Sequence, residues 1–68
     1  MKLVWEESMR RPQTLLAEGP TGTITVWYDR NGDIEPGWYA SIPEYVTYQA
    51  KSADDAKAWA QAYVDSIQ

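Results

Sequence analysis

Cysteine, histidine and phenylalanine are absent from the sequence. Without Cys and His, the chain has no thiol nucleophile, no disulfide, no His-based acid–base catalyst and no zinc-finger ligand set. Basic residues are few, because 6 Lys and Arg stand against 10 Asp and Glu and leave a net charge of -4. This charge argues against a general binder of the nucleic-acid phosphate backbone.

Long apolar runs are absent as well. A membrane-spanning helix needs about 20 mostly apolar residues, and a signal peptide needs an apolar run of roughly 7–15 residues. The N-terminal stretch reaches two acids, Glu6 and Glu7, before any such run has formed. We therefore expect a soluble, cytoplasmic protein with no membrane partner.

Aromatic residues that carry a polar group are plentiful, since the 68 residues include 4 Trp and 5 Tyr. Hydrophobic residues make up 44% of the chain, which is too many for a compositionally disordered protein. A chain of this length is expected to form a single domain, residues 1–68, that buries only about 60% of its unfolded surface.

Short runs rich in β-branched and aromatic residues predict strands, and turn residues separate them. The clearest turn signals are Gly19-Pro20-Thr21-Gly22 and Asn31-Gly32, and Pro43 ends a run. The predicted strands are Leu3–Trp5, Thr14–Glu18, Thr23–Tyr28, Trp38–Ile42 and Val46–Ala50.

Residues Ser52 to Ile67 predict one helix. Ser52 is a good N-cap residue, and Asp55 stands at the third helical position as in a capping box. One apolar stripe follows helical spacing and consists of Ala56, Trp59, Ala60, Tyr63 and Ile67.

These elements predict an α+β fold: a small antiparallel sheet of four to five strands with the C-terminal helix packed across one face. Because side chains alternate along a strand, the helix should cover Ile24, Val26, Trp38, Ala40 and Ile42. Tyr28, Trp38, Trp59 and Tyr63 are expected in this core.

The opposite, open face of the sheet is the candidate binding surface. It should present Trp27 and Tyr39 among Thr and Ser hydroxyls, with Asp29, Asp33 and Glu35 as a charged rim. Trp and Tyr are enriched at the energetic centres of protein interfaces. The same arrangement resembles a stacking platform for single-stranded nucleic acid, but the acids outnumber the bases, so a protein partner is favoured.

No residue pattern indicates catalysis or a cofactor. Asp29, Asn31 and Asp33 have the alternate spacing of a calcium loop, but the Gly and Glu that such a loop needs are replaced by Ile34 and Ala40. The sequence has no nucleophile motif and no phosphate-binding Gly loop. We therefore expect no metal site, no cofactor and no enzymatic activity.

Two segments resemble the N-terminal domain of HicB-type antitoxins: Gly37-Trp38-Tyr39-Ala40-Ser41-Ile42-Pro43-Glu44 and Ser52-Ala53-Asp54-Asp55-Ala56. The resemblance extends over residues 24–67 and implies a βββα unit that blocks a small basic RNA-cleaving toxin. Lys51 departs from the family, which usually has Gly before the helix cap, and residues 1–22 have no counterpart. The pattern is also similar to that of small phage and mobile-element proteins.

Together these observations predict a small, acidic, non-enzymatic protein-binding domain that acts as a phage or bacterial accessory or anti-defence factor. Its partner would be a host or toxin protein with a basic face. The alternatives left open are a HicB-like antitoxin module and single-stranded nucleic-acid binding on the open face. An open sheet edge or the aromatic face would also support a homodimer.

Overall fold

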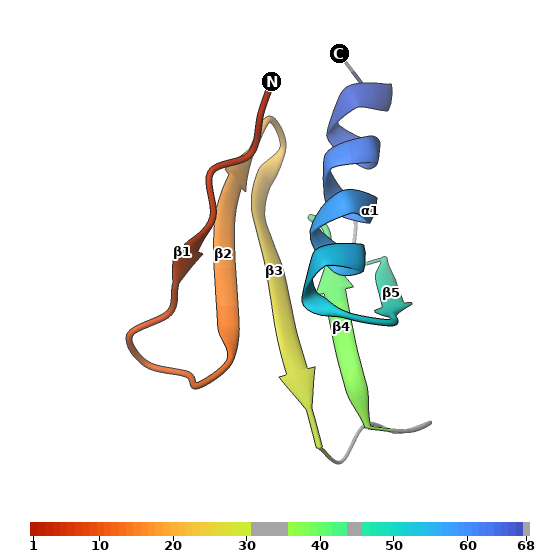
Figure 1. The fold of residues 1–68 in the computed structure, drawn as a ribbon. Helices are drawn as coiled ribbons and strands as arrows, with labels where there is room; N and C mark the ends of the chain where they lie inside the picture. Colours follow the sequence, from red (N-terminus) through yellow and green to blue (C-terminus); the bar gives the residue numbers. More distant parts are fainter. Residues whose placement is uncertain (31–35, 44–45, 68) are drawn as a thin grey trace.

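The computed structural model describes residues 1–30, 36–43 and 46–67, which form one antiparallel sheet and one helix (Figure 1). The sheet order is β1-β2-β3-β4-β5, so every strand pairs with its neighbours in sequence. The α+β fold predicted from the sequence is therefore confirmed, with five strands. The elements are β1 (Glu6–Glu7), β2 (Thr14–Gly19), β3 (Gly22–Asp29), β4 (Gly37–Ser41), β5 (Thr47–Ala50) and α1 (Ala53–Ser66).

The β2–β3 hairpin turns where the sequence predicts it. Gly19 pairs with Gly22, which leaves Pro20 and Thr21 as the turn. Gly22 has a φ of 141°, a conformation that side chains other than glycine rarely adopt. The Cβ of any other residue at this position would lie 3.1 Å from the Cγ of Pro43. Glycine is thus required here both by the backbone and by the close approach of the chain after β4.

Helix α1 begins at the predicted cap. The Ser52 Oγ accepts a hydrogen bond from the Asp55 N–H at 3.0 Å. The Asp55 carboxylate in turn accepts from the Lys51 N–H at 3.0 Å and from the Tyr48 hydroxyl at 3.1 Å. This network satisfies donors at the helix start and ties α1 to β5. The hydrogen bond to Asp55, followed by desolvation, raises the pKa of Tyr48 above its ordinary value of 10.0.

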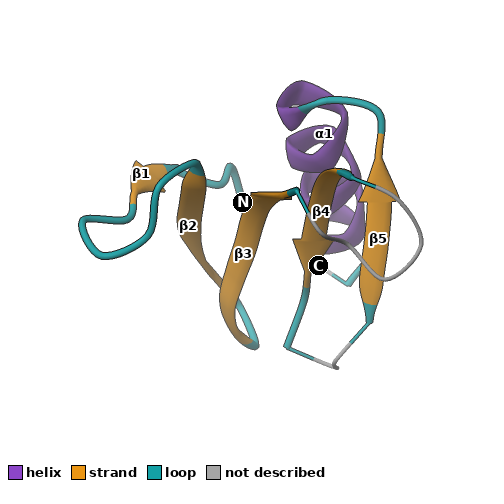
Figure 2. Ribbon diagram, turned by 90° about the horizontal axis from the view of Figure 1, so that it is seen from below, coloured by secondary structure: helices purple, strands orange, loops and turns teal. Residues whose placement is uncertain are grey.

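The helix lies over β3, β4 and β5 and leaves the other side of the sheet bare (Figure 2). Its buried residues are Ala56, Ala60 and Val64, spaced four apart, so small side chains let the helix approach the strands closely. Ile67 was predicted in this stripe, and that was wrong: it is the C-cap residue, 46% exposed, and Val64 occupies the core instead. Trp59 packs against both clusters of buried core residues, and its ring stacks on that of Tyr48 with centroids 4.9 Å apart.

The core confirms which face of the sheet the helix covers. Ile24, Val26 and Ala40 are fully buried beneath α1, and Ile42 is 6% exposed. Trp38 is only half-buried and packs against the edge of this core. It forms an edge-to-face pair with Tyr28, with ring centroids 5.5 Å apart.

The N-terminal residues 1–5 form an arm rather than the predicted strand Leu3–Trp5, because the paired residues are Glu6 and Glu7. Leu3 is 5% exposed and packs with residues of β2, β3 and α1. Its N–H donates to the Gln61 Oε1 at 2.9 Å, and the Gln61 Nε2 donates to the Met1 carbonyl at 2.6 Å. One helix side chain therefore holds the arm over the part of the sheet that α1 does not reach. No helix in the described part of the chain is long and apolar enough to cross a membrane.

Candidate functional site

Two aromatic rings stand together on the sheet face opposite the helix. Trp27 of β3 is directly paired with Tyr39 of β4. Their rings stack with centroids 5.7 Å apart and an interplanar angle of 22°. On the flanking strands the same cross-strand row continues through Thr14 of β2 and Gln49 of β5. The two predicted contact residues are thus brought together by the register of the sheet.

The two rings do not have equal access to solvent. Tyr39 is 9% exposed, whereas Trp27 is only partly buried and belongs to neither cluster of the core. Thr14, on the other side of Trp27, is 6% exposed, and its hydroxyl donates to the Pro12 carbonyl at 3.0 Å. The indole therefore lies between two buried residues of this row, and its ring stacks on that of Tyr39. Trp27 is the ring that a partner can reach, and Tyr39 supports it.

Carboxylates lie on the same open face as this pair. Asp29 lies two residues beyond Trp27 on β3, opposite Gly37, and so faces the same side. The other two predicted rim residues, Asp33 and Glu35, lie outside the described residues. The register also places Glu6 and Glu18 on this face, because Glu6 pairs with Leu16 and Glu18 with Thr23. Sequence reasoning missed these two residues, which only strand pairing assigns to a face.

The charge on the sheet is of one sign. The five described strands contain Glu6, Glu7, Glu18 and Asp29 and no Lys or Arg. The Glu18 carboxylate accepts a hydrogen bond from the Thr23 hydroxyl at 2.9 Å, which fixes one of these charges on the open face. Such a surface favours a positively charged partner and speeds its association.

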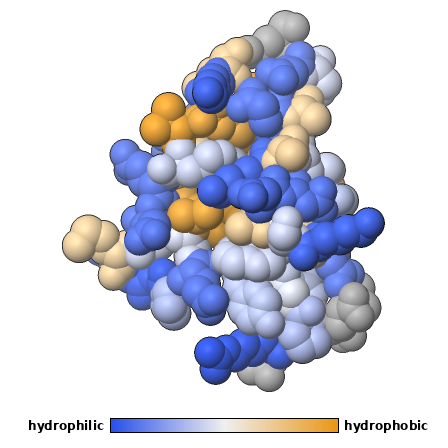
Figure 3. All heavy atoms as spheres, in the orientation of Figure 1, coloured by the Kyte–Doolittle hydropathy of each residue, from blue (hydrophilic) through white to orange (hydrophobic). Residues whose placement is uncertain are grey.

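A hollow lies on each side of the β1–β2 edge. On the helix side, a hollow of about 370 Å³ is lined by the loop after β1 together with Glu7, Leu15 and Trp38. Figure 3 shows this side of the molecule, where surface of intermediate hydropathy spreads below the helix. The second hollow, of about 440 Å³, lies between the arm and β2. Trp38, which the sequence placed in the core with its indole N–H at the margin, also lines the first of these surface hollows.

The described residues contain no group of three or more His, Cys, Asp or Glu side chains that could hold a metal ion. The raised pKa of Tyr48 belongs to the helix cap, where its hydroxyl donates to Asp55. The arrangement that stands out is therefore the supported indole of Trp27 among carboxylates. Comparison with known proteins gave no match to this chain from any family model, curated protein or solved structure.

Proposed function

We propose that this chain is a non-enzymatic protein-binding domain whose open sheet face binds a basic surface of its partner. The observation that carries this proposal is the stacked pair of Trp27 and Tyr39 at the centre of the face that the helix leaves bare. A core-facing role does not explain Trp27, because the helix and both hydrophobic clusters lie on the other side.

The chemistry of this face suits an arginine or lysine side chain. A cation over an indole gains about 0.5–1 kcal/mol at an exposed site and about 2 kcal/mol when water is excluded. Tyr39 stacks against one side of the indole, so little side-chain freedom remains to be lost on binding. The carboxylates of Glu6 and Glu18 lie on the same face and add long-range attraction.

The setting that fits best is a phage or bacterial accessory factor, including an anti-defence factor that occupies a host protein. A small acidic domain with one aromatic face can block the basic functional surface of a larger protein. Trp27 would then be the energetic centre of the interface, and its truncation would cost 2 kcal/mol or more, which is about 30-fold in affinity.

A second candidate is the antitoxin module that the resemblance implies. The order β3, β4, β5, α1 is the βββα order of that family, which supports the fold part of the resemblance. A small RNA-cleaving toxin is itself basic, so both candidates use the same surface chemistry. They differ in the partner: the antitoxin reading requires that co-expression of this chain relieves the growth arrest caused by such a toxin.

Affinity capture from bacterial lysate with matched variants tests the proposal. The baits are the wild type, Trp27→Ala, Glu6→Lys and Glu7→Lys. Glu6 and Glu7 are neighbours on β1, both exposed, and face opposite sides of the sheet. We expect the wild type and Glu7→Lys to capture the same basic protein. Trp27→Ala should not capture it, and Glu6→Lys should bind it more weakly. Retention by Trp27→Ala at the wild-type level would overturn the proposal, and Trp27-dependent capture of single-stranded nucleic acid would replace it.

A further inference from the structure

The hollow between the arm and β2 arises because a strand ladder stops early. The Ser8 N–H donates to the Thr14 carbonyl at 2.8 Å, and the register continues through Glu7 with Leu15 to Glu6 with Leu16. Antiparallel bonding would continue with Val4 opposite Glu18. Instead the arm turns toward the helix, where Leu3 is buried and Gln61 binds the backbone on either side of residue 2. A gap of about 440 Å³ is left beside the outer edge of β2.

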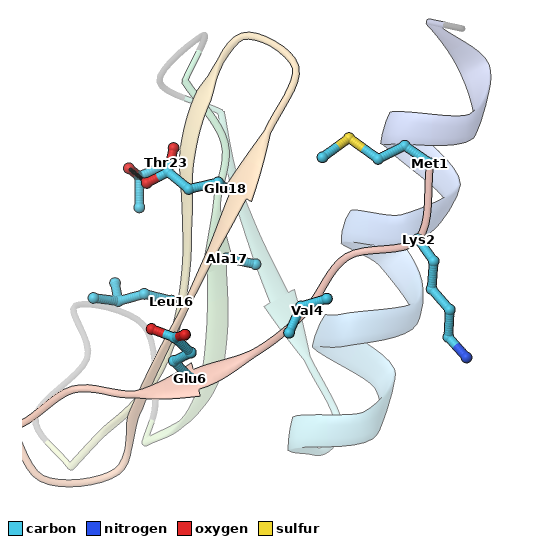
Figure 4. A pocket seen from close by; sticks show the side chains of 8 residues that line it. All are labelled: Met1, Lys2, Val4, Glu6, Leu16, Ala17, Glu18 and Thr23. Carbon is cyan, nitrogen blue, oxygen red and sulfur yellow. Dashed lines mark hydrogen bonds between the residues drawn. The ribbon is translucent and has the colours of Figure 1, made fainter.

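Half of the residues that line this hollow are apolar. Met1 and Val4 come from the arm, and Leu16 and Ala17 come from β2. Figure 4 shows the side chains of Met1 and Val4 between the arm and the sheet, within the gap. Val4 is 74% exposed and Met1 is 54% exposed. Side chains of this kind remain this accessible only where nothing in the described chain covers them.

The charge at the mouth of the hollow is negative. Glu6 and Glu18 line it, and their side chains extend toward the face that bears Leu16 and Thr23 (Figure 4). Lys2 also borders the hollow, but its side chain points away from the sheet (Figure 4). A ligand for this hollow therefore has an apolar group to fill it and positive charges beside that group.

The hollow is continuous with the face that carries Trp27. Thr23 borders the hollow and lies on the same strand and the same side as Trp27, with only Thr25 between them. Four residues along a strand span about 14 Å. An extended peptide covers that distance with about four residues, since each residue adds at most 3.3–3.6 Å. One extended segment can therefore contact the indole and fill the hollow together.

We propose that this hollow is the second anchoring point of the open face and receives an apolar side chain of a basic, extended segment of the partner protein. The inference rests on the proposed function, because it assigns the hollow to the same partner that Trp27 binds. The partner segment then has a basic residue at Trp27 and an apolar residue about four positions away, with further basic residues between them.

Two peptides of equal charge test the spacing. The first is Leu-Lys-Ser-Lys-Arg-Lys-Ser-Lys-Leu, which places a leucine four positions from the central arginine in either direction of the chain. In the second, serine replaces both leucines. Each is titrated into the full chain labelled with ¹⁵N, and dissociation constants and shifted resonances are recorded. We expect the leucine peptide to bind about tenfold more tightly than the serine peptide. It should also shift the backbone resonances of Val4, Leu16 and Ala17.

Val4→Ser supplies the matched variant, with Val46→Ser as its control. Both valines are exposed, at 74% and 49%, so neither change should unfold the domain. Val4→Ser should remove most of the preference for leucine, and Val46→Ser should keep it. Equal binding of the two peptides with shifts at Trp27 alone would overturn this inference and leave the proposed function standing. If neither peptide shifts the resonances of Trp27, the proposed function is overturned as well. If resonances at the hollow shift with protein concentration in the absence of peptide, the occupant is a second copy of the chain and the inference is overturned.

Discussion

Truncation of Leu3 tests whether the arm is part of the core. Leu3 is 5% exposed and contacts a cluster that contains Ile24, Ile42 and Val64. Leu→Ala changes at buried sites cost about 2–5 kcal/mol, and the cost is lower where the surroundings can close the cavity. Because Leu3 lies near a chain end that can shift, we expect Leu3→Ala to lower the free energy of unfolding by about 2–3 kcal/mol.

That loss is large for this protein. A domain of 68 residues is expected to have a total stability of about 3–10 kcal/mol. A loss of 2–3 kcal/mol would lower the melting temperature by roughly 10–20 °C in a domain of this size. It would also lower the urea midpoint by about 2–3 M if the denaturant slope is near 1 kcal/mol/M.

The assay is urea unfolding followed by circular dichroism, with Val4→Ala as the control. Val4 adjoins Leu3 in the arm but is 74% exposed, so its truncation should change stability by less than about 0.5 kcal/mol. If the free energy of unfolding of Leu3→Ala lies within that same margin of the wild type, the arm is not docked as described. Equal losses in both variants would show that the arm packs in a different register.

Three further changes probe the core, the hairpin and the helix cap. Trp59→Ala should cost about 3 kcal/mol, because the indole packs against both core clusters and stacks on Tyr48, and urea unfolding measures the loss. Gly22→Ala should lower the free energy of unfolding by about 1–2 kcal/mol, because Gly22 has a φ of 141°. Gly37→Ala is the control and should lower it less, because its added Cβ meets nothing within 4 Å. Because the pKa of Tyr48 is raised in the folded state, its contribution to stability is complete below the ordinary value of 10.0 and is lost as the pH rises through the raised value. Tyr48→Phe should therefore lose less stability than the wild type as the pH rises above 10.0, measured by denaturation at each pH. An unchanged pH profile would contradict the hydrogen bond to Asp55.

Local signals in the sequence were enough to predict the main elements. Ser52 and Asp55 have the spacing of a helix cap, and the helix begins where they predict it. The alternation in β3 correctly separated Ile24 and Val26, which are buried, from Trp27 on the other face. Both signals depend on residues within a few positions of each other, so no tertiary contact is needed to interpret them.

Features that depend on distant contacts could not be predicted. The arm is held by Gln61, which lies 58 positions from Leu3 and carries no pattern that marks it as a clamp. The burial of Tyr39 depends on the register with β3, which stacks Trp27 against it. Ile67 fits the helical stripe by spacing, but the helix ends before it and Val64 fills the core.

The central claim is that the open face binds a basic partner through Trp27. The most direct test is a titration of the ¹⁵N-labelled chain with hexa-arginine amide, in which the indole N–H and backbone resonances are followed. We expect the largest shifts on Trp27 and its neighbours in β3 and β4, and we expect Trp27→Ala to weaken binding about tenfold or more. Glu6→Lys should weaken binding more than Glu7→Lys does. The claim is contradicted if the shifts centre on α1 or on the Trp38 hollow, or if folded Trp27→Ala binds the peptide as tightly as the wild type.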